Sequence, residues 1–308
     1  MLPQYRSFED VLLETERLCS RRPGATVETY GHSVEGRPLR LGFVPGKDER
    51  VLVLVAGLHG LEVIGPAVAL RFLERVTETP LECSVAVVPV SNPDGYVRCW
   101  ESAGTASYAA MRQNAHGIDL NRNFPLPRGA HPSRWPYAGS NRPGDVAYRG
   151  PRPLSEPESE HLAQRLRALR PHAALSLHSF GGVLIHPPAR DRETWATYGA
   201  LARSFRRGSG RSLYRRLGVP WGDPFTGELE DWLHYSLGCW ATCVELHPLW
   251  DSLCEGFGFG NWAERFNPRV PENRTEEMTN GVLAWFAHAQ ELSPLSPCSE
   301  SSVTPAAW

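Results

Sequence analysis

Residues 51–62 read VLVLVAGLHGLE, and this stretch decides the fold class. Its first half is a short run of aliphatic, mostly β-branched residues that ends in glycine, as expected for a strand buried on both faces. A second run of this kind, SVAVVPVS at residues 84–91, follows a segment with helical apolar spacing from about 63 to 76. Strands that alternate with helices predict an α/β sandwich with a mostly parallel sheet and helices on both faces.

The rest of the chain extends this pattern. We expect an antiparallel pair from TVETYGHS and RPLRLGFV, and further strands from AALSLH, GVLIHP and CWATCVEL. Further helices are expected in FEDVLLETERL, after SEPE as a capping box, in ETWATYGALARSFRR, in LEDWLHYSLG and in TEEMTNGVLAWFAHAQ. Residues 92–152 show little periodicity and are predicted to form a long loop, of a kind that is usually functional or disordered. No repeat or linker divides the chain, so we expect one domain, residues 1–292, and a disordered Ser/Pro-rich tail, residues 293–308.

Composition narrows the possible partners. The 308 residues are 41% hydrophobic and carry a net charge of -2, so no global basic field would gather nucleic acid or anionic lipid. The N-terminus has no uninterrupted apolar run of the kind that marks a signal peptide, and no segment is long enough to span a bilayer. We therefore expect a cytoplasmic protein, with neither nucleic acid nor a membrane as partner.

The seven cysteines fit a reducing compartment, because their number is odd, they are scattered and several lie in apolar stretches. Cys239 and Cys243 could form a metal pair, but they lie in one predicted strand and have no partner cysteines nearby. Buried thiols are the interpretation that we favour.

Three possible metal ligands lie at the ends of predicted strands. His59 and Glu62 come directly after VLVLVAG, and His178 ends AALSLH. A catalytic zinc needs three protein ligands and an open position for water, and two histidines with one carboxylate are a known ligand set. The HxxE spacing alone is frequent by chance, and a surface histidine beside a solvated glutamate is the simpler interpretation of it.

Two polar motifs in the long loop change this interpretation. NPDGY at 92–96 and MRQNAHGIDLNRNFP at 111–125 place many polar groups in a domain with a large core. With HGLE, SEPE, LHSFGG and VEL, in this order and at these separations, they resemble the zinc carboxypeptidase family. The resemblance runs from YGHSVEGRPL through the last predicted helix, without a signal or propeptide. It implies the family's fold, a three-layer sandwich in which a mixed eight-stranded sheet carries helices on both faces.

The resemblance also implies how the metal site works. His59, Glu62 and His178 match the family's zinc ligands, for one zinc ion per chain, and Glu245 in ATCVELHP matches the general base and acid. Zinc lowers the pKa of its water and polarises the scissile carbonyl, while a nearby carboxylate takes the water proton and returns it to the leaving amine.

Further residues match the family's substrate-binding positions. Arg112 matches the guanidinium that stabilises the developing oxyanion. Asn121 and Arg122 match the pair that receives the terminal carboxylate, so the expected partner is a peptide or peptide-like substrate with a free C-terminal carboxylate. The simpler interpretation of Arg122 is a loop salt bridge to Asp119 or Asp94.

One family feature is missing before the DW pair. Family members usually carry a tyrosine about eight residues before the aspartate of this pair, where this chain has Asp223. A small register shift would bring Trp221 near that position, and Tyr214 lies too far upstream. The size and selectivity of the site are therefore open. Glu230, just before Asp231, falls where the family sets the preference for the last side chain, and a carboxylate there favours a cationic group. A solvated helix face is the simpler interpretation of these acidic residues.

The leading hypothesis is a cytosolic zinc carboxypeptidase that releases a C-terminal amino acid. An alternative is a murein-peptide amidase that cuts beside diaminopimelate, and another is a deacylase of small N-acyl amino acids. A non-enzymatic alternative is an inactive relative that binds peptides. The complete set of His59, Glu62, His178 and Glu245 favours an enzyme.

Overall fold

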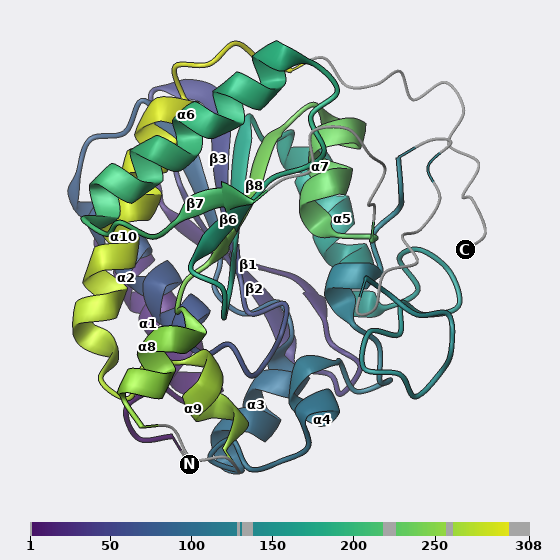
Figure 1. The fold of residues 1–308 in the computed structure, drawn as a ribbon. Helices are drawn as coiled ribbons and strands as arrows, with labels where there is room; N and C mark the ends of the chain where they lie inside the picture. The colour runs from purple at the N-terminus through teal and green to yellow at the C-terminus, as the bar shows by residue number, and fades with distance from the viewer. Residues whose placement is uncertain (1, 128–129, 131–137, 218–225, 257–260, 296–308) are drawn as a thin grey trace.

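The structure, a computed structural model, describes residues 2–127, 130, 138–217, 226–256 and 261–295. In this part of the chain a single eight-stranded sheet has the order β1-β2-β4-β3-β5-β8-β6-β7 (Figure 1). Its strands are β1 (Thr26–His32), β2 (Pro38–Val44), β3 (Asp48–Ala56), β4 (Cys83–Val88), β5 (Ala173–His178), β6 (Val183–Ile185), β7 (Arg215–Leu217) and β8 (Trp240–Glu245). The central strands β4, β3, β5 and β8 are parallel neighbours, and β1, β2 and β6 join antiparallel. The predicted mixed, mostly parallel sheet is confirmed.

Strand β3 shows why its sequence has an unbroken apolar run. Leu52, Leu54 and Ala56 lie in the core on one face of the sheet. Val53 and Val55 lie in a second core on the other face. Successive side chains of a strand point to opposite faces, so a strand covered on both sides needs apolar residues throughout.

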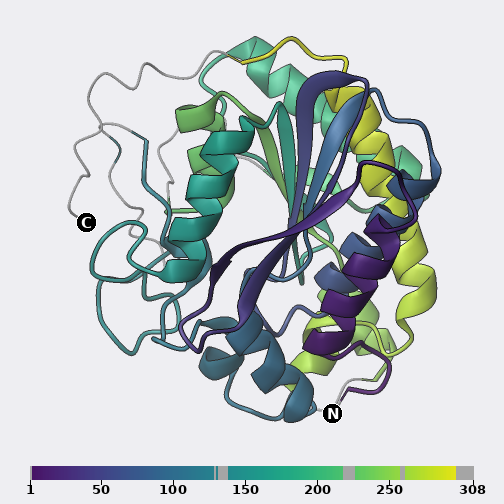
Figure 2. The ribbon, with the colours of Figure 1, turned by 180° about the vertical axis from the view of Figure 1, so that it is seen from behind.

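The helices form a layer on each face of the sheet. In Figure 1, α6 and α10 lie on one side of the strands and α5 and α7 on the other; Figure 2 shows from behind that α1 lies on the side of α10. The helices are α1 (Phe8–Cys19), α2 (Ile64–Glu78), α3 (Pro93–Glu101), α4 (Tyr108–Arg112), α5 (Pro157–Leu169), α6 (Arg192–Ser209), α7 (Leu229–Leu237), α8 (Leu249–Cys254), α9 (Trp262–Phe266) and α10 (Pro271–Ala289), with a short 3₁₀ helix at Leu120–Arg122. The predicted three-layer sandwich is therefore confirmed. No helix in the described ranges is long and apolar enough to cross a membrane.

The predicted long loop contains helices that the sequence analysis missed. Helix α3 begins at the NPDG segment, which the sequence analysis assigned to the long loop. The Asn92 side chain accepts a hydrogen bond from the Gly95 N–H (3.0 Å), and Pro93 occupies the first turn, where its missing N–H costs nothing. The same residues that looked like loop signals are therefore the cap of a helix.

The predicted capping box at SEPE is wrong. Helix α5 has Glu156 at its N-cap and shows no side-chain capping bond. Ser155 bonds instead to Glu156 and Asn123, and Glu158 accepts hydrogen bonds from the Val34 N–H and Asn114. These side chains hold the neighbouring loops rather than the helix terminus.

The predicted disordered tail falls mostly on residues 296–308, which lie outside the described part of the chain. The same holds for Trp221 and Asp223, so their relation to the site stays open. The division into a domain at 1–292 and a tail remains a prediction.

Candidate metal and substrate site

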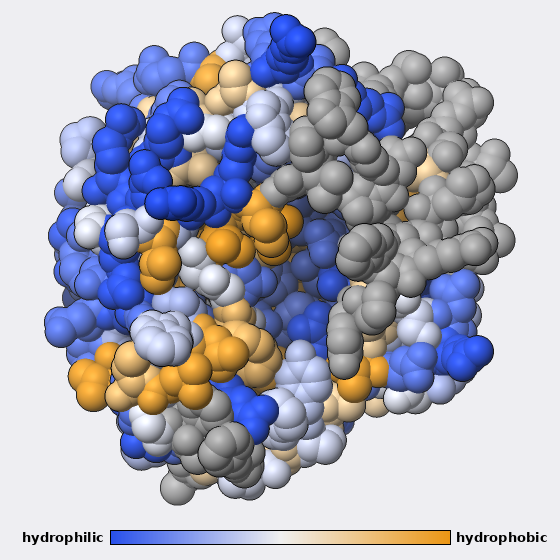
Figure 3. Space-filling view, viewed as in Figure 1, coloured by the Kyte–Doolittle hydropathy of each residue, from blue (hydrophilic) through white to orange (hydrophobic). Residues whose placement is uncertain are grey.

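Three adjacent parallel strands end at the same edge of the sheet and carry the predicted metal and base residues. His59 and Glu62 lie between β3 and α2, His178 is the last residue of β5, and Glu245 is the last residue of β8. His178 and Glu245 are register partners in the β5–β8 pair. The carboxyl ends of parallel strands are where such sheets place ligand sites. In the space-filling view this face of the molecule is hollowed near its centre, and the hollow is largely hydrophilic (Figure 3).

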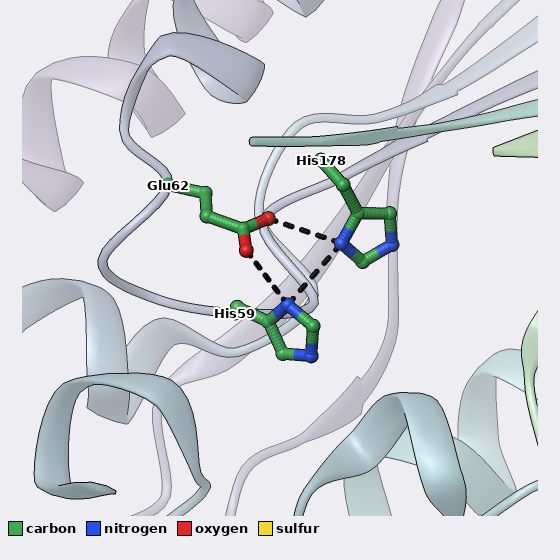
Figure 4. A group of neighbouring side chains, drawn as sticks. All are labelled: His59, Glu62 and His178. Atoms are coloured by element: carbon green, nitrogen blue, oxygen red, sulfur yellow. Dashed lines mark hydrogen bonds and ion pairs between the residues drawn. The ribbon is translucent and has the colours of Figure 1, made fainter. Parts of the chain in front are cut away.

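His59, Glu62 and His178 point toward one another (Figure 4). The two Nδ1 atoms are 3.2 Å apart, and each lies close to one oxygen of Glu62, at 2.9 Å from His59 and 3.0 Å from His178. The three residues are 4%, 2% and 2% exposed. The interpretation of HxxE as a solvated surface pair is therefore wrong.

This donor set fits a zinc ion. Ligand atoms at about 2 Å from a tetrahedral ion lie roughly 3.3 Å from one another, which is close to the spacing of these three atoms. The Nε2 atom of His59 donates to Asp119 Oδ1 at 3.1 Å, which leaves its Nδ1 lone pair for a metal. Burial acts to raise the pKa of Glu62, but His59 and His178 outweigh it and lower the pKa to about 2. Glu62 is thus ionised, which is the form in which a carboxylate binds a metal.

Glu245 has the environment expected of a general base. Burial raises its pKa to about 7, and the negative charge of Glu62 acts in the same direction. Its Oε2 atom is buried and has no hydrogen-bond partner among the described residues. A carboxylate oxygen without a protein partner, next to His178, is available to a water molecule or a substrate.

Arg112 and His59 are connected through Asp119, whose importance the sequence analysis missed. Asp119 is fully buried, and its Oδ2 accepts from Arg112 Nε (2.9 Å) and Nη2 (2.7 Å), while Oδ1 accepts from His59. The Arg112 Nη1 atom lies 3.4 Å from the Tyr108 hydroxyl, another residue that the motifs did not single out. The position of Asp119 inside the DLNRN motif was the signal that could have identified it.

Asn121 and Arg122 follow directly in the 3₁₀ helix. Asn121 Nδ2 is 3.3 Å from His178 Nε2, and its Oδ1 accepts from the Leu229 N–H at 2.9 Å. Arg122 Nη1 forms a salt bridge to Glu228 Oε1 at 3.1 Å. Arg122 therefore does form a salt bridge, but to Glu228 rather than to the predicted partners Asp119 or Asp94.

The acidic residues at the start of α7 are buried rather than on a solvated face. Glu230 is 2% exposed and accepts a hydrogen bond from Ser176, and Asp231 is 5% exposed. Burial raises the pKa of both carboxyl groups, and the charge of Glu228 adds to the effect. Glu230, His178 and Cys243 form a second group of possible ligand atoms, but this group shares His178 with the first. Cys239 and Cys243 are both buried free thiols, as expected.

Tyr214 does not replace the missing family tyrosine. It is fully buried, and its hydroxyl donates to the Leu246 carbonyl at 2.6 Å. Its ring therefore belongs to the core.

A family comparison agrees with this geometry. The zinc carboxypeptidase family model matches residues 14–275. The chain belongs to the zinc carboxypeptidase family. The family implies zinc, and His59, Glu62 and His178 are the group of described residues that fits it best.

Curated relatives include carboxypeptidase A2 of Mus musculus, which is 29% identical over 202 residues, or 59% of this chain and 46% of the relative. Murein peptide amidase A of Escherichia coli K12 is 34% identical over 157 residues, or 49% of this chain and 58% of the relative. This chain thus spans about half the length of the curated relatives it matches. The solved structure of bovine thrombin-activatable fibrinolysis inhibitor, in complex with tick carboxypeptidase inhibitor, aligns with a TM-score of 0.75 and 23% identity, over 94% of this chain and 99% of the other. This last likeness supports the family fold.

Proposed function

We propose that the protein is a zinc-dependent hydrolase that removes a C-terminal amino acid from peptides or peptide-like molecules. The observation that carries the proposal is that Asn121, part of the proposed carboxylate anchor, lies next to one of the proposed metal ligands. Asn121 lies 3.3 Å from the proposed ligand His178, and Arg122 is its neighbour in the chain. A terminal carboxylate held at Arg122 brings the last peptide bond to the metal, which is the geometry of an exopeptidase.

The roles of the residues follow from their positions. A zinc ion held by His59, Glu62 and His178 would supply a Lewis acid and an acidified water. Glu245 would serve as the base that accepts a proton from the attacking water and returns it to the departing amine. Arg112, held in place by its double hydrogen bond to Asp119, presents a permanent positive charge where negative charge develops on the carbonyl oxygen.

The murein-peptide amidase remains the second candidate. The 34% identity to murein peptide amidase A over 157 residues favours it specifically. Both candidates could act next to a residue with a side-chain amine, because lysine and diaminopimelate each carry an amine at the end of their side chains. A cytoplasmic location is part of the proposal, because the odd number of scattered cysteines fits a reducing compartment.

The test is a product analysis on a defined peptide pool. Zinc-loaded protein is incubated with peptides ending in basic, acidic, apolar or diaminopimelate residues, and products are identified by mass. We expect loss of single terminal residues, reduced about 10²–10⁴-fold in Glu245→Gln. Glu49→Gln, which changes an exposed glutamate far along β3 from the site, is the matched control. Cleavage only beside diaminopimelate would establish the amidase, and no cleavage by a zinc-loaded protein would contradict both.

A further inference from the structure

The salt bridge between Arg122 and Glu228 occupies the proposed carboxylate anchor. Arg122 Nη1 lies 3.1 Å from Glu228 Oε1, and the two side chains are only 12% and 23% exposed. The same Nη1 donates to the Asn121 carbonyl oxygen at 2.7 Å. A carboxylate of the protein thus lies on Nη1 of Arg122, one of the guanidinium atoms through which a substrate carboxylate would bind.

Glu228 is held toward Arg122 by its place at the start of α7. It is the N-cap residue of this helix, yet its side chain accepts no capping hydrogen bond. The N–H of Leu229, the first helical residue, bonds instead to Asn121 Oδ1. The Glu228 carboxylate thus makes no bond to the helix N–H groups, and its salt bridge is to Arg122.

Displacing Glu228 from Arg122 has an electrostatic cost. Among the described residues, Arg122 is the one cation that forms a salt bridge with Glu228. Two further carboxyl groups, Glu230 and Asp231, lie close enough for the charge of Glu228 to raise their pKa. A bare carboxylate ligand that takes Arg122 therefore leaves Glu228 without a counter-ion in a partly buried, acidic environment.

We propose that Glu228 is a specificity-determining gate on Arg122, which admits ligands that bring a cationic group together with their terminal carboxylate. The carboxylate of such a ligand replaces Glu228 on Arg122, and its ammonium or guanidinium becomes the new partner of Glu228. Residues with a basic side chain next to the terminal carboxylate meet this requirement, and apolar ones do not. The inference rests on the proposed function, because it takes Arg122 as the carboxylate anchor.

The gate differs from the predicted role of Glu230. Glu230 is 2% exposed and already accepts a hydrogen bond from Ser176. Glu228 is more accessible and is paired with the anchor itself. Variants at Glu228 and at Glu230 therefore distinguish selection by the anchor's ion pair from selection by the buried Glu230.

The experiment measures binding rather than turnover. The zinc-loaded full chain, with Glu245→Gln to stop cleavage, is titrated by calorimetry with hippuryl-lysine and with hippuryl-norleucine, which differ by one terminal amine. We expect the lysine probe to bind about tenfold more tightly, the ratio that corresponds to one part-buried ion pair. In the added variant Glu228→Gln the ratio should fall to about threefold or less, because the norleucine probe gains affinity and the lysine probe loses it.

Matched variants keep the result interpretable. Glu230→Gln should retain most of the preference, and zinc content together with thermal unfolding should show that Glu228→Gln is folded. An unchanged ratio in Glu228→Gln, or a ratio lost only in Glu230→Gln, would overturn the gate. Failure of both probes to bind, or binding unaffected by Arg122→Gln, would instead refute the anchor and with it the proposed function.

Discussion

Asp119 is the residue on which two parts of the site depend. One of its oxygens accepts from the ligand His59 and the other from Arg112. Although burial would raise the pKa of Asp119, the neighbouring Arg112 and His59 hold it well below its usual range. The carboxylate therefore stays ionised and fixes both the ring of His59 and the guanidinium of Arg112.

Replacing Asp119 with asparagine should weaken both functions at once. The uncharged amide cannot orient His59 and neutralise Arg112 as the carboxylate does, so zinc affinity should fall about 10–100-fold. Competition with a chromogenic chelator measures this affinity. The exposed Asp145, which bonds to Ser140, provides the matched Asp→Asn control. Equal zinc affinity in Asp119→Asn and in the control would contradict the role of Asp119.

At the scale of elements, the loop between β3 and α2 is positioned by a close backbone approach. A Cβ atom at Gly60 would lie 2.1 Å from the Gly95 carbonyl carbon and 2.2 Å from the Tyr96 nitrogen, both at the start of α3. The loop that carries His59 and Glu62 therefore packs directly on the backbone of α3. Glycine is required at this position because any side chain would separate the two elements.

Gly60→Ala should be strongly destabilising. Because the clash is with backbone atoms, the loop must move, and we expect a loss of about 3 kcal/mol or more in the free energy of unfolding, with weakened zinc binding. Gly65→Ala in α2 is the control, since its nearest heavy atom would be at an ordinary 3.4 Å. That change should alter the free energy by about 1 kcal/mol or less. Urea denaturation of both variants tests the account, and a harmless Gly60→Ala would refute it.

The elements also show where sequence patterns succeed. The apolar runs that became β3, β4, β5 and β8 were predictable because both faces of these strands are buried. Short elements were not predictable in this way. Strand β7 (Arg215–Leu217), for example, is a three-residue edge strand with two arginines and an exposed leucine. Helix α3 was hidden by its own cap, because Asn, Pro and Gly at a helix start resemble a turn.

The residues of the candidate site were likewise predictable from the sequence only in part. Residues with a recognisable motif were predicted, and the structure brings His59, Glu62, His178 and Glu245 to one sheet edge. The pairing of Arg122 with Glu228 was not predictable, because it joins segments 106 positions apart without a shared pattern (228 minus 122). The burial of Glu230 was likewise set by tertiary packing.

For the whole molecule, buried histidines should set part of the acid sensitivity. Burial lowers the pKa of His186 and His234 to about 4, from an ordinary value of 6.5. Below pH 6.5 the unfolded chain binds protons at these rings that the folded chain does not. Their contribution is therefore complete above pH 6.5 and is lost as the pH falls toward 4, by at most about 1.4 kcal/mol per pH unit for each ring.

His186→Gln should reduce this dependence. Urea unfolding of the metal-free protein at about pH 7 and about pH 5 shows how steeply the free energy of unfolding falls with pH. In the variant this free energy should fall less steeply, because unfolding takes up fewer protons, by up to roughly one. The metal-free form is used because zinc release would add its own pH dependence. Identical slopes in the variant and the parent would mean that His186 does not remain neutral in the folded state.

The central claim is that one zinc ion at His59, Glu62 and His178 makes this molecule a peptide hydrolase. The most direct test is to titrate zinc into metal-stripped protein while measuring bound zinc per chain and the release of terminal residues from the peptide pool. We predict that release rises with bound zinc and levels off at about one ion per chain, and that His178→Ala abolishes both. Terminal-residue release that does not depend on zinc, or tight zinc binding that survives in His178→Ala, would contradict the account.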